Sequence, residues 1–190
     1  MTALIERPAI EDVAARRYTA KDFETLPDDS KEYELIDGEL VEMKGASGRH
    51  SEVISVIDTS LRAHSKTNKL GRVFVNAPVA LNDKNEPRPD VLFVAAGKLP
   101  DDFEGPILAI PDLVVEVNSP SDTTKGIYDK LVKYRAAGVR LIWSVFLLER
   151  YVLIYRLGNP KIQLLNLDDD LDGEDVIPGF KLKVSTIFEQ

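Results

Sequence analysis

The chain has 190 residues, of which 44% are apolar and 29% are charged, so it can bury a hydrophobic core, and two independent domains are not expected. It contains no cysteine, which excludes disulfide scaffolds, thiolate zinc sites, iron–sulfur clusters and cysteine nucleophiles. No apolar stretch approaches the roughly 18 residues of a membrane span. Residues 1–17 lack the continuous apolar segment of a secretory signal, so we expect a cytoplasmic protein.

The formal net charge of −8 is distributed unevenly along the chain. Residues 1–42 hold 12 acidic and 5 basic side chains, residues 168–190 hold 7 and 2, and residues 43–167 hold 13 and 17. An acidic protein is a poor candidate for broad adhesion to nucleic acid, but a basic centre keeps such a partner possible. Composition alone does not decide between these alternatives.

The N-terminal region divides into an arm and the start of an ordered domain. Residues 1–17 show no clear hydrophobic period and are predicted to be a flexible arm, whereas residues 18–190 are predicted to form a single domain. Thr19-Ala20-Lys21-Asp22 has the pattern of a capping box, which predicts a short helix that ends before Pro27.

Alternating and helical patterns follow in turn. Residues 33–36 and 39–42 alternate polar with apolar side chains around Asp37-Gly38, which predicts an antiparallel hairpin. From Ser51 to Lys66 apolar residues repeat at helical spacing. Short segments rich in β-branched and aromatic residues predict six further strands, at residues 73–81, 90–95, 112–118, 141–147, 151–157 and 162–167.

A third helix is predicted over residues 121–137, because Gly138 supplies a favourable helix end. It lies between the strands predicted at 112–118 and 141–147, which indicates a crossover unit within a mixed sheet. We therefore predict an α/β fold in which helices flank a central mixed sheet. The acidic segment 168–175 lacks the spacing of a calcium-binding loop and is predicted to be a solvated loop.

Two carboxylates in apolar surroundings are the first candidates for chemistry. Asp90 opens one predicted strand and Glu116 lies within another, where an unpaired carboxylate would be costly to bury. If the two strands are neighbours, Asp90 and Glu116 converge on one cation, and hard carboxylate oxygens suit Mg²⁺ or Mn²⁺. The alternative is that Asp90 caps a turn and Glu116 pairs with a basic side chain.

Lys130 and His50 are the candidate partners of these acids. Lys130 lies on the apolar face of the helix after Glu116, where it either extends to solvent or points back to the carboxylates and holds a water or a phosphate oxygen. His50, at a predicted helix start, either positions a phosphate or relays a proton, or is an ordinary surface histidine. Glu34 and Glu39 are further acids on the hairpin, although alternation predicts that they face solvent.

An ordered series of segments along the chain is similar to one known family. The series comprises Tyr33–Met43, His50, Arg88–Val91, Leu113–Val117, Ser119–Asp122, Asp129-Lys130, Tyr134, Gly138-Val139 and Gly173–Phe180. From about Tyr18 to Phe188 the chain resembles the Uma-two family, which is assigned to the PD-(D/E)XK nuclease superfamily.

This resemblance implies a restriction-endonuclease-like core and a deoxyribonuclease that hydrolyses DNA phosphodiester bonds with Mg²⁺ or Mn²⁺. By position, Asp90 and Glu116 resemble the metal-binding acids. The lysine that usually lies two residues after the glutamate is replaced by Asn118 here, and Lys130 resembles its substitute, with Lys125 as a weaker candidate. A second departure lies in residues 143–149, where relatives end the strand with aspartate and proline.

The sequence hypothesis is thus a metal-dependent endonuclease in which Asp90, Glu116, Lys130 and His50 are catalytic and DNA is the substrate. The alternatives are an inactive binding or assembly module of the same fold, favoured by the acidic charge, and a different metal hydrolase that uses the same acids. Cleavage of both DNA strands would favour a homodimer.

Overall fold

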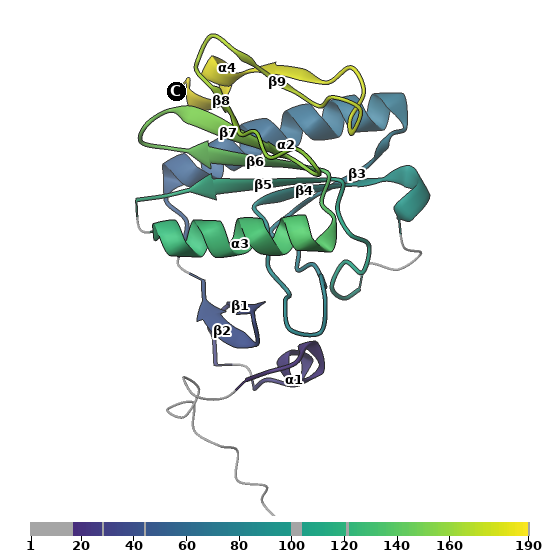
Figure 1. Ribbon diagram of the computed structural model, residues 1–190, viewed down its shortest axis with the longest axis vertical. Helices are drawn as coiled ribbons and strands as arrows, with labels where there is room; N and C mark the ends of the chain where they lie inside the picture. Colours follow the sequence, from purple (N-terminus) through teal and green to yellow (C-terminus); the bar gives the residue numbers. More distant parts are fainter. Residues whose placement is uncertain (1–16, 28, 44, 100–103, 121, 190) are drawn as a thin grey trace, which may run out of the picture.

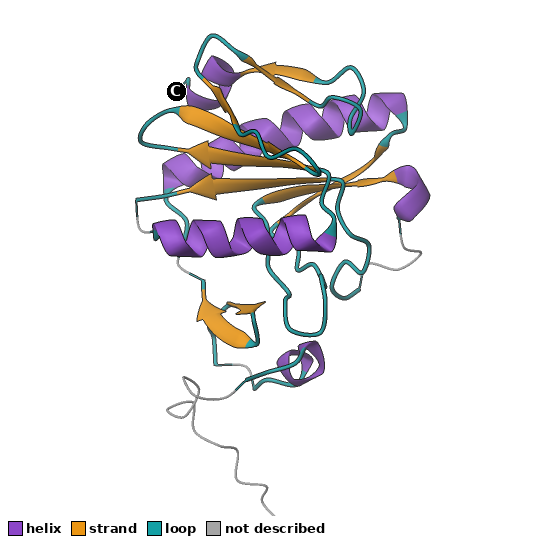
Figure 2. Cartoon of the chain, in the orientation of Figure 1, coloured by secondary structure: helices purple, strands orange, loops and turns teal. Residues whose placement is uncertain are grey.

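A mixed six-stranded sheet forms the centre of the fold, with a long helix on one face and a shorter helix on the other (Figures 1 and 2). The computed structural model describes residues 17–27, 29–43, 45–99, 104–120 and 122–189, so residues 1–16 of the predicted arm lie outside the described residues. In order across the sheet, the strands are β3 (Gly71–Val75), β4 (Val91–Ala95), β5 (Leu113–Asn118), β6 (Leu141–Phe146), β7 (Tyr151–Arg156) and β8 (Gln163–Leu165).

The crossover predicted from the sequence is present. Strands β5 and β6 are parallel and are connected by α3 (Thr124–Ala137), whereas the other neighbouring strands of this sheet are antiparallel. The side chain of Thr123 caps the start of α3, and Gly138 ends it in a left-handed conformation with φ of 94°. These observations confirm the predicted α/β class.

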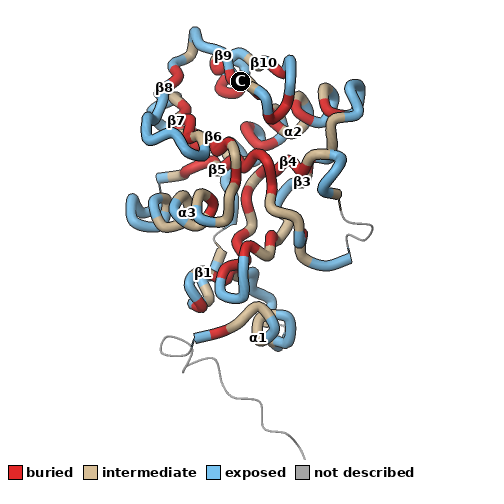
Figure 3. Tube along the Cα trace, turned by 45° about the vertical axis from the view of Figure 1, so that its right-hand side comes forward, coloured by how far each residue is buried: buried red, intermediate tan, exposed pale blue. Residues whose placement is uncertain are grey.

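The two faces of the sheet have separate hydrophobic cores. In Figure 3 the central strands are largely red, which marks buried residues. On one face, α2 (Gly48–Asn68) buries Val53, Ile57 and Leu61 against the sheet together with the C-terminal segment. On the other face, Tyr134 of α3 packs among apolar side chains of the sheet. The remaining helices are α1 (Ala20–Glu24), which has the predicted capping box, η2 (Ala96–Lys98) and α4 (Val184–Phe188).

The hairpin of β1 (Tyr33–Ile36) and β2 (Glu39–Glu42) lies apart from the main sheet, below α3 in Figure 1. Asp37 and Gly38 have φ of 51° and 77°, as the tight turn requires. Leu35 exchanges two backbone hydrogen bonds with Glu86, of 3.3 and 2.8 Å, and the N–H of Gly38 donates to the carbonyl of Lys84 at 2.9 Å. The hairpin is therefore fixed to the loop between β3 and β4.

Two segment predictions were wrong. The strand predicted at 73–81 ends at Val75, because Asn76 adopts a φ of 50° and Pro78 cannot donate a ladder hydrogen bond. The acidic segment 168–175 is more than a solvated loop, because β9 (Asp170–Asp172) pairs with β10 (Lys181–Lys183) and buries Leu171 completely. Apolar contacts distant in sequence thus fold a segment whose local composition predicts exposure.

Candidate active site

Asp90 and Glu116 are brought together by the register of β4 and β5. Val91 pairs with Val115, so continuing the antiparallel register by one residue places Asp90 opposite Glu116. Residues directly opposite in such a pair have Cβ atoms roughly 5 Å apart. One oxygen of Asp90, Oδ2, accepts a hydrogen bond of 2.6 Å from the N–H of Val117, which directs the carboxylate to the strand that carries Glu116.

Glu116 is held from the α3 side of the sheet, where its side chain is only 16% exposed. The Tyr134 hydroxyl donates a hydrogen bond of 2.5 Å to Oε1 of Glu116, and Nζ of Lys130 lies 3.4 Å from Oε2. Residues 130 and 134 are one helical turn apart, so both side chains reach the same carboxylate from α3. Tyr134 belongs to the family-like series in the sequence, but its contact with Glu116 was not predicted.

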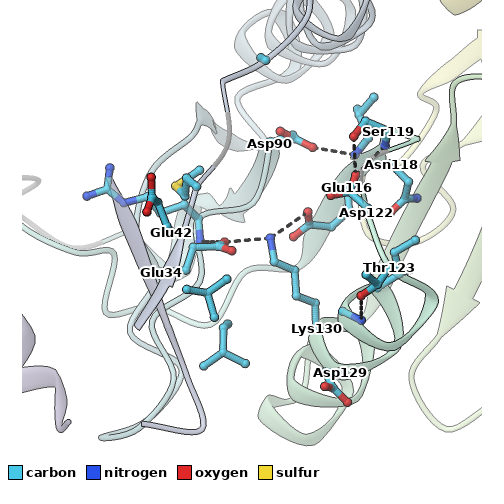
Figure 4. Close-up of a pocket in the computed structure, with 18 of the residues that line it drawn as sticks. Glu34, Glu42, Asp90, Glu116, Asn118, Ser119, Asp122, Thr123, Asp129 and Lys130 are labelled. Carbon is cyan, nitrogen blue, oxygen red and sulfur yellow. Dashed lines mark hydrogen bonds and ion pairs between the residues drawn. The ribbon is translucent and has the colours of Figure 1, made fainter. Parts of the chain in front are cut away.

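Lys130 also contacts a second carboxylate, as Figure 4 shows. Its Nζ lies 2.8 Å from Oε1 of Glu34, so one ammonium group joins the hairpin to β5. Its side chain is 24% exposed and points into the site instead of extending to solvent. Lys125 lines the same cavity, but its side chain is 87% exposed and is directed to Asp129.

The expectation that Glu34 and Glu39 face solvent was wrong for Glu34. The residue is only 4% exposed, and its Oε1 accepts a hydrogen bond of 2.7 Å from the N–H of Arg88. Both faces of the hairpin are covered, because Leu35 on the opposite face is buried completely. Alternation along one strand cannot reveal a second covered face. Glu39 is exposed as expected and pairs with Arg17.

His50 lies in the first turn of α2 and faces Asp90. Its Nε2 is 3.5 Å from Oδ1 of Asp90, and its side chain is 15% exposed. The hydrogen bond to Asp90 raises the pKa of His50 above its ordinary value, although burial opposes this effect. Its Nδ1 is buried and has no hydrogen-bond partner within the described part of the chain. The contact with Asp90 is therefore the interaction that fixes the ring beside the acid pair.

Negative charge is in excess at this site. Burial, together with the nearby carboxylates of Asp90 and Glu34, raises the pKa of Glu116 to about 7, although Lys130 and the Tyr134 hydroxyl act in the opposite direction. Burial disfavours the ammonium form of Lys130, but the attraction of Glu116 and Glu34 outweighs it and raises the pKa of Lys130. Two carboxylates thus share the ammonium of Lys130, and a third, Asp90, lies close enough to raise the pKa of Glu116. The site therefore favours an additional cation.

The donor atoms fit a hard divalent cation that retains water. Asp90 and Glu116 supply carboxylate oxygens, and Mg²⁺ is commonly held by one or two carboxylates together with waters and substrate phosphates. Among the described residues, no group of three or more His, Asp or Glu side chains is arranged as a complete metal site. Asp90 and Glu116 would therefore supply part of the metal's coordination shell, and water and substrate would supply the rest.

The carboxylates line a cavity of about 1050 Å³ between the hairpin, β5 and α3. Along its lining, carboxylates outnumber cationic side chains.

Among the described helices, none combines the length and the apolar character needed to cross a membrane.

The fold and the site define a protein of the restriction-endonuclease-like class. Consistent with this, the structure superposes with a TM-score of 0.80 on a crystal structure from Anabaena variabilis ATCC 29413 described as "a putative nuclease belonging to DUF820". The two chains are 19% identical over 90% of this chain and 97% of the other, a level of identity that supports the shared fold. A search among curated proteins finds no match.

The chain belongs to the Uma2 family, described as "Putative restriction endonuclease", whose family model matches residues 20–185. The match spans the site residues from Glu34 on the hairpin to Tyr134 on α3. It confirms the family resemblance found in the sequence.

Proposed function

We propose that this protein is a divalent-metal-dependent endonuclease that hydrolyses DNA phosphodiester bonds in the cavity around Asp90 and Glu116. The observation that carries the proposal is that Asp90 lies opposite a buried Glu116 of raised pKa, while Glu116 and Glu34 share the ammonium of Lys130. The protein's own cationic groups do not balance these carboxylates, so the binding of a metal cation is favourable. The family description supplies the reaction class.

Asp90 and Glu116 would hold the ion, either Mg²⁺ or Mn²⁺. The chemistry that such an ion supplies when bound is Lewis-acid stabilisation of negative charge on a phosphoryl oxygen. The bond from the Val117 N–H keeps Asp90 oriented, and the Tyr134 hydroxyl keeps Glu116 oriented. Preorganised ligands of this kind lower the cost of assembling the site when substrate arrives.

Lys130 and His50 would act on the substrate itself. The ammonium of Lys130 lies beside Glu116 and carries a positive charge at neutral pH, so it can orient the attacking water and stabilise charge that develops on the phosphate. His50 contacts Asp90 through Nε2 and its pKa is raised, so it can hold or pass a proton beside the acid pair. Their positions on α2 and α3 place them on different sides of the two acids.

The test is a cleavage assay with Mg²⁺ or Mn²⁺ on plasmid and oligonucleotide DNA. Glu116→Gln and Lys130→Met should each reduce the rate by about a hundredfold or more, the scale of losing one charged group that stabilises a transition state. Lys161→Met is the control and should retain activity, because Lys161 is exposed and does not line the cavity.

Equal cleavage by all four proteins would identify a contaminating nuclease. Absence of metal-dependent cleavage by the wild type would favour the inactive binding or assembly module, which the excess of acidic side chains along the cavity also favours.

A further inference from the structure

The hairpin β1–β2 forms a roof over one side of the cavity, and we use "roof" below for residues 33–42. Its register pairs Glu34 with Val41 and Ile36 with Glu39, so these four side chains share one face. All four line the cavity. Figure 4 shows this hairpin across Lys130 from β5. The roof is therefore one wall of the site that holds the carboxylates.

The roof is held on two sides. On its far side, it is bonded to residues 84–86 of the loop between β3 and β4. On the near side, Lys130 of α3 contacts Glu34 at 2.8 Å, and Lys133 one turn along contacts Asp37 at 2.5 Å. The same ammonium of Lys130 also contacts Glu116, so the roof covers the acids from the hairpin side, and the side chains of Asp90 and Glu116 are only 15% and 16% exposed. A phosphodiester group must therefore enter the cavity to reach them. The cavity volume of about 1050 Å³ corresponds to a space roughly 10 Å across, which is narrower than a double helix, whose major groove alone is about 12 Å wide.

The roof also presents apolar side chains to the cavity. Val41 is 43% exposed and Ile36 is half-buried, although neither is needed for the main cores. In a duplex the bases are stacked and paired, and the outer surface offers phosphates and sugars. In an unpaired strand the bases are free to pack against apolar or aromatic side chains. An apolar wall beside the carboxylates therefore suits unpaired nucleotides.

The charge of the side chains that line the cavity also favours unpaired nucleotides over a duplex. A protein that grips duplex DNA neutralises many phosphates with lysine and arginine side chains. Along this cavity, carboxylates outnumber cationic side chains, with Asp37 and Glu39 on the roof itself. The site is thus suited to one phosphate and its neighbouring bases, and less suited to two backbones at once.

We propose that the site acts on unpaired DNA, such as a single strand, a flap or an unpaired loop, in preference to a continuous duplex. The chemistry of this inference rests on the proposed nuclease function, whereas the substrate class rests on the roof.

The first test compares one sequence as a single strand, as a blunt duplex and as a duplex with a central unpaired loop, each incubated with the full chain and Mn²⁺. Cleavage of unpaired nucleotides should be at least about tenfold faster than cleavage of the duplex, a factor that corresponds to about 1.4 kcal/mol. The cuts in the looped substrate should map to the loop. Equal or faster cleavage of the blunt duplex would overturn the proposal.

Binding separates this proposal from the nuclease function. Fluorescence anisotropy with Glu116→Gln and labelled DNA in Mn²⁺ measures affinity without turnover. If no DNA is cleaved but the single strand binds about tenfold more tightly than the duplex, the substrate class stands and the nuclease function fails. Equal affinities would overturn the substrate class.

A double variant tests the roof itself. Replacing Ile36 and Val41 by threonine keeps β-branched side chains on the strands but removes the apolar wall. The affinity for the single strand should fall about fivefold, with the melting temperature as a check on folding. The matched control replaces Ile162 and Leu164, which are 54% and 49% exposed near the distant edge strand β8, and should leave the affinity unchanged. Equal effects of the two double variants would contradict a role for the roof.

Discussion

Replacing Glu116 by glutamine tests the electrostatics of the site without any nucleic acid. Burial, with Asp90 and Glu34 nearby, raises the pKa of Glu116 from 4.5 to about 7 in the folded protein. Below pH 4.5 the carboxyl is neutral in both the folded and the unfolded chain, so it imposes no cost. As the pH rises to 7 the unfolded chain ionises first, and the free energy of unfolding falls. Each pKa unit corresponds to about 1.4 kcal/mol, so the loss at pH 8 is about 3 kcal/mol.

Glutamine cannot ionise, so the Glu116→Gln protein should not lose this stability. The assay is urea unfolding of both proteins at pH 5 and pH 8 in the presence of a chelator. Between these pH values, the wild type should become less stable relative to the variant by about 2.5 kcal/mol, because part of the loss has already occurred at pH 5. Contributions from titrating groups distant from Glu116 cancel in the comparison. The pKa of about 7 for Glu116 already includes the attraction of Lys130, which lowers it.

Mn²⁺ provides a second readout of the same charge. A ligand that binds only the folded state stabilises it in proportion to the logarithm of its concentration. At pH 8, Mn²⁺ should therefore stabilise the wild type and have little effect on Glu116→Gln. A stability difference between the two proteins that is the same at pH 5 and pH 8 would refute the argument from excess negative charge.

Two further predictions concern one hydrogen bond and one close backbone approach. Tyr134→Phe removes a hydrogen bond that lowers the pKa of Glu116, so the pH at which Mn²⁺ binding is half-maximal should rise, as measured by calorimetric titration at several pH values; an unchanged midpoint would contradict the assigned role. Gly173→Ala would place a Cβ 2.4 Å from the carbonyl oxygen of Ile177, so it should destabilise the protein by about 2 kcal/mol or more. Gly97→Ala meets no atom within 4 Å and should cost less than about 1 kcal/mol; equal shifts of the melting temperature for the two glycine variants would count against the steric argument.

Local signals in the sequence predicted the elements that local interactions stabilise. The capping box at Thr19, the Asp37-Gly38 turn and the end of α3 at Gly138 each depend on hydrogen bonds and dihedral angles within a few residues. The face of Glu116 was also predictable, because side chains alternate along a strand. Lys130 was placed on the same side by the helical period of α3.

Contacts between distant segments decided what the sequence did not show. Glu34 and Lys130 are 96 positions apart in the sequence. Glu34 is buried because the hairpin contacts the 84–86 loop and α3. The strand β9 formed within an acidic segment because Leu171 reaches the core that α2 and the C-terminal residues share. No local sequence pattern predicts the burial of Glu34 or the formation of β9.

The sequence by itself thus determined the order of helices and strands as far as β8, the faces on which Glu116 and Lys130 lie and the family to which the chain belongs. Only the tertiary structure decided that Asp90 stands opposite Glu116, that the hairpin closes over both and that one lysine is shared by two carboxylates. The physical reason is that periodicity fixes the direction of a side chain along its own element, whereas strand register and the docking of a hairpin are set by burial between elements distant in the chain.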